Sequence, residues 1–167
     1  GGDMAALDRA RPAIEPFAGM IQHVGASGTG FAVKAVNNML LAVNLWAAAE
    51  GFTALKAHGV DLNAALSCIN ASSGRSMATE MVLPQRVLNR AFPSTFALAL
   101  LAKDTAIALD LVQQAKLPAP LLALTQSLVL ASSNTAESNA DFSALVKLLE
   151  AWTGVIFYEA IFPAARR

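Results

Sequence analysis

The sequence is poor in charge. Charged residues make up 14% of its 167 residues, and Lys+Arg and Asp+Glu are equal at 12 each. An average globular protein has about 25% charged residues. A general nucleic-acid binder is disfavoured, because no excess of positive charge is present to neutralise phosphates. Intrinsic disorder is excluded, because 55% of the residues are hydrophobic and a disordered chain needs low hydrophobicity and high charge.

Cysteine is scarce as well. The single cysteine, Cys68, excludes an internal disulfide and fits a reducing compartment, so we expect a cytoplasmic protein. We expect Cys68 to be a small buried apolar residue. His23 and His58 lack Cys, Asp or Glu neighbours at metal-ligand spacing, so no metal site is predicted. The N-terminus shows no basic segment followed by an apolar one, so no signal peptide is expected.

Long uninterrupted apolar runs are also absent. The longest cover residues 39–49, which Asn44 interrupts, and residues 96–102, which Lys103 ends. A membrane-spanning helix needs about 20 apolar residues, so we expect neither run to cross a bilayer. The excess apolar surface is then predicted to lie in a large core or a subunit interface.

The first 26 residues differ in pattern from the rest. Residues 4–18 carry apolar residues at helical spacing, and residues 20–24 form a short strand-like run bounded by glycines. A lone strand leaves its backbone groups unpaired. We therefore predict that residues 1–26 are the tail of an upstream α/β domain; an irregular N-terminal arm is the alternative.

From residue 27 onward only helices are predicted, which makes the fold an all-α helical bundle built around one long central helix. Proline is absent from residues 31–58, where Ala and Leu dominate, and this is the predicted central helix. The other expected helices cover residues 62–71, 95–116, 121–133 and 141–158, with Asp61, Ser94 and either Ser138 or Asp141 as N-caps. Residues 77–90 are predicted to be irregular, or a short helix that Pro84 breaks.

The start of the central helix carries an unusual polar group. Lys34 and Asn38 lie about 40° apart on one helical face, with Asn37 beside them. Burying an amine or amide without partners costs about 1–3 kcal/mol, so the group indicates either a wet cleft that binds a ligand or the exposed end of a helix. The preceding glycine-rich turn, residues 25–30, matches neither phosphate-binding motif, because Phe31 and Val33 stand where Lys and Gly are required.

Several segments together resemble the β-hydroxyacid dehydrogenases, a family that includes 3-hydroxyisobutyrate dehydrogenase, tartronate semialdehyde reductase and L-threonate dehydrogenase. The Gly-x-Gly turn, the lysine after it and the asparagine one helical turn later resemble that family's domain junction. The similar segments occur in the same order along nearly the whole chain; they are residues 23–38, 71–76, 96–104, 118–124 and 141–145.

The resemblance implies a function and a site. The chain would be the C-terminal, 6-phosphogluconate-dehydrogenase-like helical domain (residues 27–167) of an oxidoreductase. Residues 1–26 would be the remnant helix and strand of a Rossmann domain that binds most of the NAD or NADP. Within this chain, the resemblance implies Lys34 as the catalytic acid/base, Asn38, Phe96 and Asp104 as substrate-binding residues, and Lys103 as a cofactor-binding residue.

The implied reaction is hydride transfer between NAD(P) and a small β-hydroxy acid or the matching semialdehyde. The expected partners are that substrate and further copies of the chain, as a dimer or tetramer, with no nucleic acid and no membrane. The chain on its own is expected to be inactive. The alternative is a catalytically inactive helical dimerisation module in which Lys34 is incidental. Phe96 is also explained as a core aromatic, and Lys103 as part of a solvated stripe with Asp110 and Gln114.

Overall fold

The computed structural model describes residues 1–158, and every regular element in this part of the chain is a helix. The α-helices are α1 (Met4–Ile14), α2 (Thr29–Ala57), α3 (Leu62–Asn70), α4 (Leu98–Gln114), α5 (Pro120–Thr135) and α6 (Val146–Thr153). Shorter helical segments are η1 (Glu15–Phe17), η2 (Ala78–Val87) and η3 (Phe142–Leu145). Within residues 1–158 no strand forms, and Ala97 and Asp141 make one isolated bridge. The predicted all-α bundle is confirmed.

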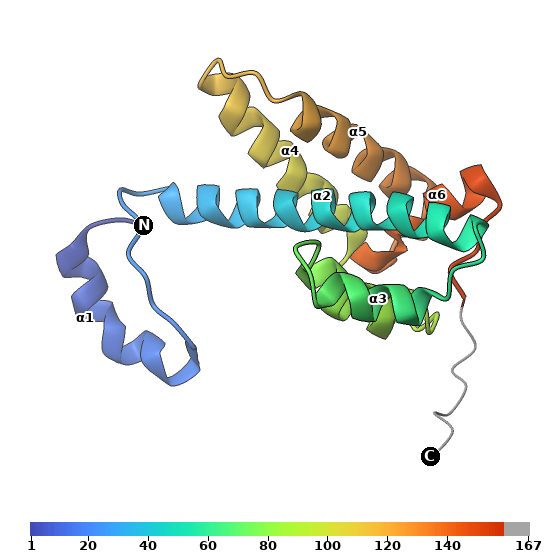
Figure 1. Ribbon diagram of the computed structural model, residues 1–167. Helices are drawn as coiled ribbons and strands as arrows, with labels where there is room; N and C mark the ends of the chain where they lie inside the picture. The colour runs from blue at the N-terminus through green and yellow to red at the C-terminus, as the bar shows by residue number, and fades with distance from the viewer. Residues whose placement is uncertain (159–167) are drawn as a thin grey trace, which may run out of the picture.

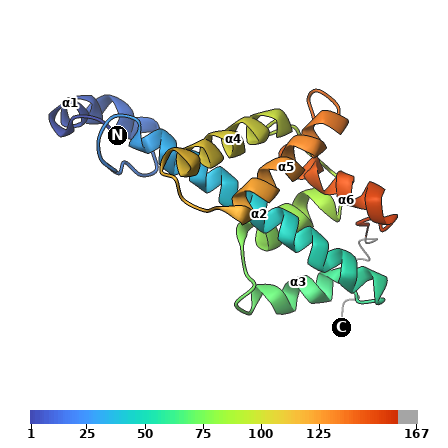
Figure 2. The same ribbon diagram turned by 90° about the horizontal axis from the view of Figure 1, so that it is seen from above.

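Helix α2 is the axis of the fold. It runs across the molecule as one rod, with α4 and α5 on one side and α3 on the other (Figure 1). Seen from above, α4, α5 and α6 lie on one side of this rod and α3 lies on the other (Figure 2). The buried face of α2 includes Leu45, Trp46 and Phe52, which belong to the main core together with residues of all the later helices. The sequence supports so long a helix because it places Ala, Leu and Met on nearly every face.

By length and hydropathy alone, α2 is also apolar enough to cross a membrane, although only 28% of its most apolar window is buried within the protein. The expectation from the sequence rested on the apolar run at residues 39–49, whereas the observed helix extends from Thr29 to Ala57. This is weak evidence for a span, since the central helix of a bundle passes the same test. Its contacts with α4, α5 and η2 are those of such a central helix.

A second, smaller apolar cluster fixes the first half of α2 against α4. Ala35 and Met39 of α2 and Ala108 of α4 are buried together, with Leu109 and Leu122 packed against them. Ala35 and Met39 each follow directly after the polar residues Lys34 and Asn38. Consecutive residues lie about 100° apart around a helix. The packing that buries Ala35 and Met39 therefore turns Lys34 and Asn38 toward the edge of the α2–α4 contact.

The predicted strand at residues 20–24 is wrong for the described chain. These residues form no regular structure, since no partner strand is present among residues 1–158. The segment returns along α1 to the start of the chain, where Gly2 N donates to Gly25 O at 2.9 Å and a His23 ring nitrogen lies 2.7 Å from Gly2 O. The preceding helix is confirmed as α1 and η1, but no residue of either is buried.

Two other boundaries differ from the prediction because contacts distant in sequence decide them. Ser94 does not cap α4, which begins at Leu98 without a side-chain cap; the main-chain N–H groups of Thr95 and Phe96 donate to Asp141 instead. The last helix ends at Thr153 rather than near residue 158, because Gly154 takes the left-handed conformation, φ +70°, that terminates helices.

Pro84 does not break its segment. Residues 78–87 form a wide π-type helix with Pro84 inside it, in which Leu88 N donates to Leu83 O across five residues. Asp61 caps α3 as predicted, accepting from Ala64 N at 2.7 Å. Cys68 is exposed rather than buried, because the buried face of α3 is formed by Leu62, Ala65 and Leu66.

Candidate active site

Lys34 and Asn38 meet a single carboxylate of α4. Lys34 Nζ donates to Asp104 Oδ2 at 2.7 Å, and Asn38 Nδ2 donates to the same oxygen at 2.7 Å. The two donors are one helical turn apart on α2, so one acceptor can serve both only if they share a face. The predicted shared face is confirmed, and the structure brings Asp104 to it from 70 residues away in sequence.

Asp104 is a charged group in a buried position. Its exposed fraction is 2%, and Lys103 Nζ lies 3.0 Å from its second oxygen, Oδ1. Burial raises the pKa of this carboxyl, but the hydrogen bonds from Lys34, Lys103 and Asn38 outweigh it and lower the pKa from 3.8 to about 2. At neutral pH the site is therefore one carboxylate shared by two ammonium groups and an amide.

The two lysines remain accessible. Each has a side chain 57% exposed, and an ammonium has three N–H donors, of which Asp104 takes one from Lys34. Lys34 lines a pocket of about 310 Å³ at the start of α2, together with Ser27, Gly28 and Phe31. Gly28 adopts φ +91° at the helix N-cap, a conformation that favours glycine. Ser27 and Phe31 were not predicted as site residues; the glycine-rich turn was the signal that pointed there.

Phe96 lies elsewhere. It precedes α4, two helical turns before Asp104, and its ring packs on Phe142 at a centroid distance of 5.9 Å. Its main-chain N–H donates to Asp141 and its carbonyl accepts from Phe142 N. In this chain Phe96 is thus positioned by η3 and not by Lys34 or Asn38, and its predicted contact with substrate stays a prediction.

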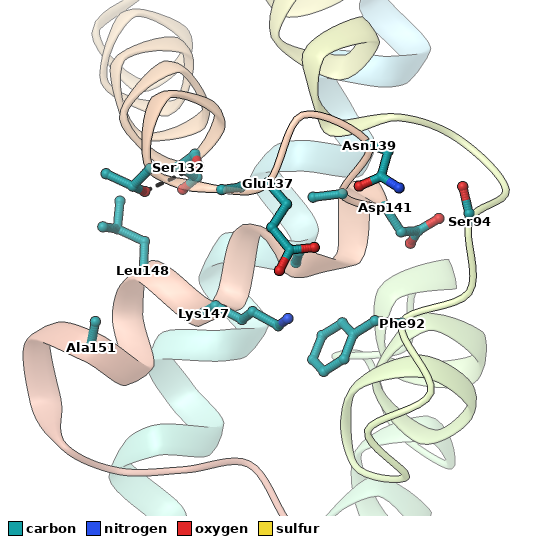
Figure 3. Close-up of a pocket in the computed structure, with 13 residues that line it drawn as sticks. Phe92, Ser94, Ser132, Glu137, Asn139, Asp141, Lys147, Leu148 and Ala151 are labelled. Atoms are coloured by element: carbon teal, nitrogen blue, oxygen red, sulfur yellow. Dashed lines mark hydrogen bonds between the residues drawn. The ribbon is translucent and has the colours of Figure 1, made fainter.

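A larger cavity, of about 540 Å³, lies at the opposite end of the bundle, between the turn before η3, α6 and Phe92. Figure 3 shows Lys147 and Glu137 extending over it, and Lys147 Nζ is 4.4 Å from the centroid of the Phe92 ring. Of the predicted site residues, Lys34, Asn38, Lys103 and Asp104 lie together near the N-terminal part of α2 instead, and Phe96 lies apart from them. Charged side chains on exposed positions at a cavity rim are ordinary for a protein surface.

The donor set at the α2 end suits an anionic or carbonyl-bearing organic group. Two ammonium groups against one carboxylate leave a local excess of one positive charge. A pocket of about 310 Å³ lies at the small end of the range for organic ligands, about 300–1,000 Å³, so it fits one end of a dinucleotide or a small acid. Among residues 1–158 no group of three His, Cys, Asp or Glu residues is placed to hold a metal ion.

Comparison with known proteins shows the family to which this chain is similar. Residues 28–149 match the family described as NAD-binding of NADP-dependent 3-hydroxyisobutyrate dehydrogenase. A probable 3-hydroxyisobutyrate dehydrogenase of Mycobacterium tuberculosis is 35% identical over 157 residues, covering 90% of this chain and 53% of the relative. The 2-(hydroxymethyl)glutarate dehydrogenase of Eubacterium barkeri is 31% identical over 155 residues, covering 93% of this chain and 52% of the relative.

A solved structure has the same fold. The M. tuberculosis 3-hydroxyisobutyrate dehydrogenase, in a structure with L-serine, superimposes with a TM-score of 0.81 at 35% identity, over 89% of this chain and 53% of that one. The chain thus spans about half the length of the curated relatives it matches. The description of the matched family names NAD binding, which supports the predicted NAD(P) cofactor.

Proposed function

Because the chain belongs to the 3-hydroxyisobutyrate dehydrogenase family, we propose that it is the helical, catalytic-lysine half of an NAD(P)-dependent dehydrogenase. The proposed substrate is a small β-hydroxy acid in the oxidative direction and the matching semialdehyde in the reductive direction. The observation that carries this proposal is the joining of Lys34, Asn38 and Asp104 through one carboxylate oxygen beside an open pocket.

In the proposed reaction, a bound NAD(P) would supply the hydride acceptor for the carbon that bears the hydroxyl group. In the oxidative direction Lys34 first gives one proton to solvent, and its neutral Nζ then takes the hydroxyl proton while the C–O single bond becomes a carbonyl. In the reverse direction the ammonium returns the proton to the carbonyl oxygen. Asn38, one turn below, keeps the amine at the edge of the pocket through their shared acceptor.

Lys103 is the residue of this chain that we assign to the cofactor. Its ammonium is held at Asp104 Oδ1 while its side chain stays 57% exposed, so it can reach an anionic group that approaches from solvent. The local positive excess suits a phosphate or carboxylate.

We further propose that residues 1–26 belong to a second domain that binds most of the dinucleotide. No residue of α1 is buried, and Phe17 and Met20 are 80% and 82% exposed. Apolar side chains this exposed are expected to pack on another domain. The relatives are about twice as long as this chain, which supports the same division.

A homo-oligomer and a cytoplasmic location complete the proposal. Val36 and Leu40 of α2 and Leu121 and Leu124 of α5 are exposed, and apolar side chains on the surface of a bundle favour association with another copy. The single cysteine supports a reducing compartment.

The test uses the complete protein and replaces Lys34 by Ala. General acid–base catalysis contributes about 10²–10⁴-fold, so we expect kcat/KM for NAD(P)-linked oxidation of small hydroxy acids to fall by a factor in that range. Lys116→Ala, at an exposed lysine beyond the end of α4, is the matched control and should keep its activity. Near-normal turnover of Lys34→Ala would remove Lys34 from the mechanism. A wild-type protein inactive on every small hydroxy acid would favour the dimerisation module.

A further inference from the structure

The Asp104 carboxylate is occupied on both sides. Oδ2 accepts from Lys34 and Asn38, and Oδ1 lies against Lys103. All of these partners are side-chain donors, and they come from both α2 and α4. A buried carboxylate needs such donors, because its desolvation is costly unless it is paired and hydrogen-bonded. The carboxylate is therefore fixed in place by the bundle, while the amines that hold it reach out to solvent.

This arrangement suits Asp104 poorly to direct contact with an acidic substrate. With a pKa of about 2, the carboxyl holds no proton to donate at neutral pH. A carboxylate also repels the carboxylate of a hydroxy acid, and like charges brought together are costly. Its accessible surface is nearly nil, at 2%.

The same arrangement suits Asp104 well to holding Lys34. A lysine side chain has four rotatable bonds and loses considerable conformational entropy when it is held in one orientation. At the rim of the pocket, Lys34 would sample many orientations without a fixed acceptor. The bond to Oδ2 fixes one of its three N–H directions and leaves two for the pocket. The small cluster of Ala35, Met39 and Ala108 holds the two helices at the spacing that this bond requires.

We infer that Asp104 is a positioning residue, which holds the Lys34 ammonium and the Asn38 amide at one oxygen so that Lys34 faces the reacting hydroxyl or carbonyl oxygen. The inference rests on the proposed function for its catalytic consequence. It assigns Asp104 a role through Lys34 in place of the substrate contact that the family resemblance implies.

The principal variant is Asp104→Asn in the complete protein. It keeps the size of the side chain but removes the charge and one acceptor. We expect kcat to fall about 10–100-fold, by analogy with the loss seen when the outer partners that orient metal ligands are replaced, while KM for the hydroxy acid changes by less than about threefold. A rise in KM with unchanged kcat would mean that Asp104 binds substrate, and would overturn the inference, as would unchanged kinetics. Asp110→Asn, at an exposed carboxylate on the same helix that accepts from Gln114, is the control.

A second readout does not depend on turnover. Acetic anhydride acylates free amines, and the extent at Lys34 can be measured by mass spectrometry of its peptide. Lys34 should be acylated several-fold faster in Asp104→Asn than in wild type or Asp110→Asn, because its ion pair is lost. Equal rates would overturn the inference. If the wild-type protein shows no dehydrogenase activity, the proposed function fails, but the acylation rates still decide whether Asp104 holds Lys34.

A third variant leaves Asp104 in place, so its own kcat and KM can be measured even if Asp104→Asn does not fold. Asn38→Ala removes the second donor to the same oxygen at a half-buried helix position where Ala is well tolerated. It should lower kcat less than Asp104→Asn does. The effects of the two changes should be less than additive when combined, because they act through one bond network. Full additivity, or an effect of Asn38→Ala on KM alone, would contradict the shared-oxygen arrangement.

Discussion

Asp104 and Asp141 are both buried aspartates whose pKa lies below the ordinary value, and their partners differ in kind. Asp141 accepts from the main-chain N–H groups of Thr95, Phe96 and Ser143, and from the Ser143 hydroxyl at 2.6 Å. Burial raises the pKa of Asp141, but these hydrogen bonds outweigh it. All the donors to Asp104 are side chains, those of two half-exposed lysines and an asparagine.

The difference separates a structural carboxylate from one at the proposed reaction site. Asp141 ties together the segment before α4 and the start of η3, and Arg86 of η2 joins them at 3.3 Å; its main-chain donors are fixed in place by the fold. The two lysines on Asp104 have side chains that are 57% exposed, and Lys34 lines the pocket at the start of α2. Comparing the donors to buried carboxylates therefore distinguishes the two roles where burial and pKa alone would not.

The largest effect is expected when the structural carboxylate is removed. Asp141→Ala should lower the free energy of unfolding by about 3–5 kcal/mol, because it leaves the largely buried Arg86 and several main-chain N–H groups without their acceptor. Denaturant titration followed by far-UV circular dichroism measures this. Asp110→Ala, at an exposed site, should change stability by no more than about 0.5 kcal/mol. A loss of stability below about 1 kcal/mol for Asp141→Ala would contradict the structural role assigned to Asp141.

A smaller effect is expected from the pH dependence of stability at Asp104. Its pKa in the folded protein, about 2, is lower than the ordinary 3.8, so the unfolded chain binds the proton more readily. The stabilisation is therefore complete above about pH 5 and is lost as the pH falls toward 2. Wild type should lose about 1–2 kcal/mol more than Asp104→Asn between pH 6 and pH 2, a value reduced because both lysines are half-exposed. Parallel losses in denaturant titrations at each pH would contradict this.

The smallest effect is expected at Lys103. Because its side chain is largely exposed, Lys103→Met should change stability by less than about 0.5 kcal/mol. If it contacts the cofactor, KM for NAD(P) should rise about 3–10-fold with kcat nearly unchanged, the pattern of lost ground-state binding. Steady-state kinetics with varied cofactor measure this. A change confined to kcat would place Lys103 with Asp104 in positioning Lys34.

Local sequence patterns predicted most of the fold. The long helix was expected at residues 31–58 and observed at Thr29–Ala57, because lack of proline and abundance of Ala and Leu act within the segment itself. The Asp61 cap was predicted for the same reason. The failures were non-local. Ser94 lost its expected capping role to Asp141, 46 residues from Thr95, and residues 20–24 had no partner strand among the described residues.

The site shows the same limit. Helical periodicity placed Lys34 and Asn38 on one face, but nothing local to either residue pointed to α4. Asp104 was reached only through the resemblance to a family, and its contact with both side chains required the packing of Ala35 and Met39 against Ala108. Phe96 entered through the same resemblance, and the structure places its ring on Phe142.

Because α2 is one continuous helix, a change in its tilt at the main core also moves Lys34 near its N-terminus. Trp46, set in the main core with its ring edge-on to Trp152, lies about 18 Å along the helix from Lys34 at 1.5 Å per residue. A tilt of about 5° about that fulcrum would swing the amine by about 1.6 Å, and displacements near 1 Å can cost about 100-fold in rate. In the proposed enzyme, mutations in the core around Trp46 would then lower kcat before they lower the free energy of unfolding enough to unfold the protein.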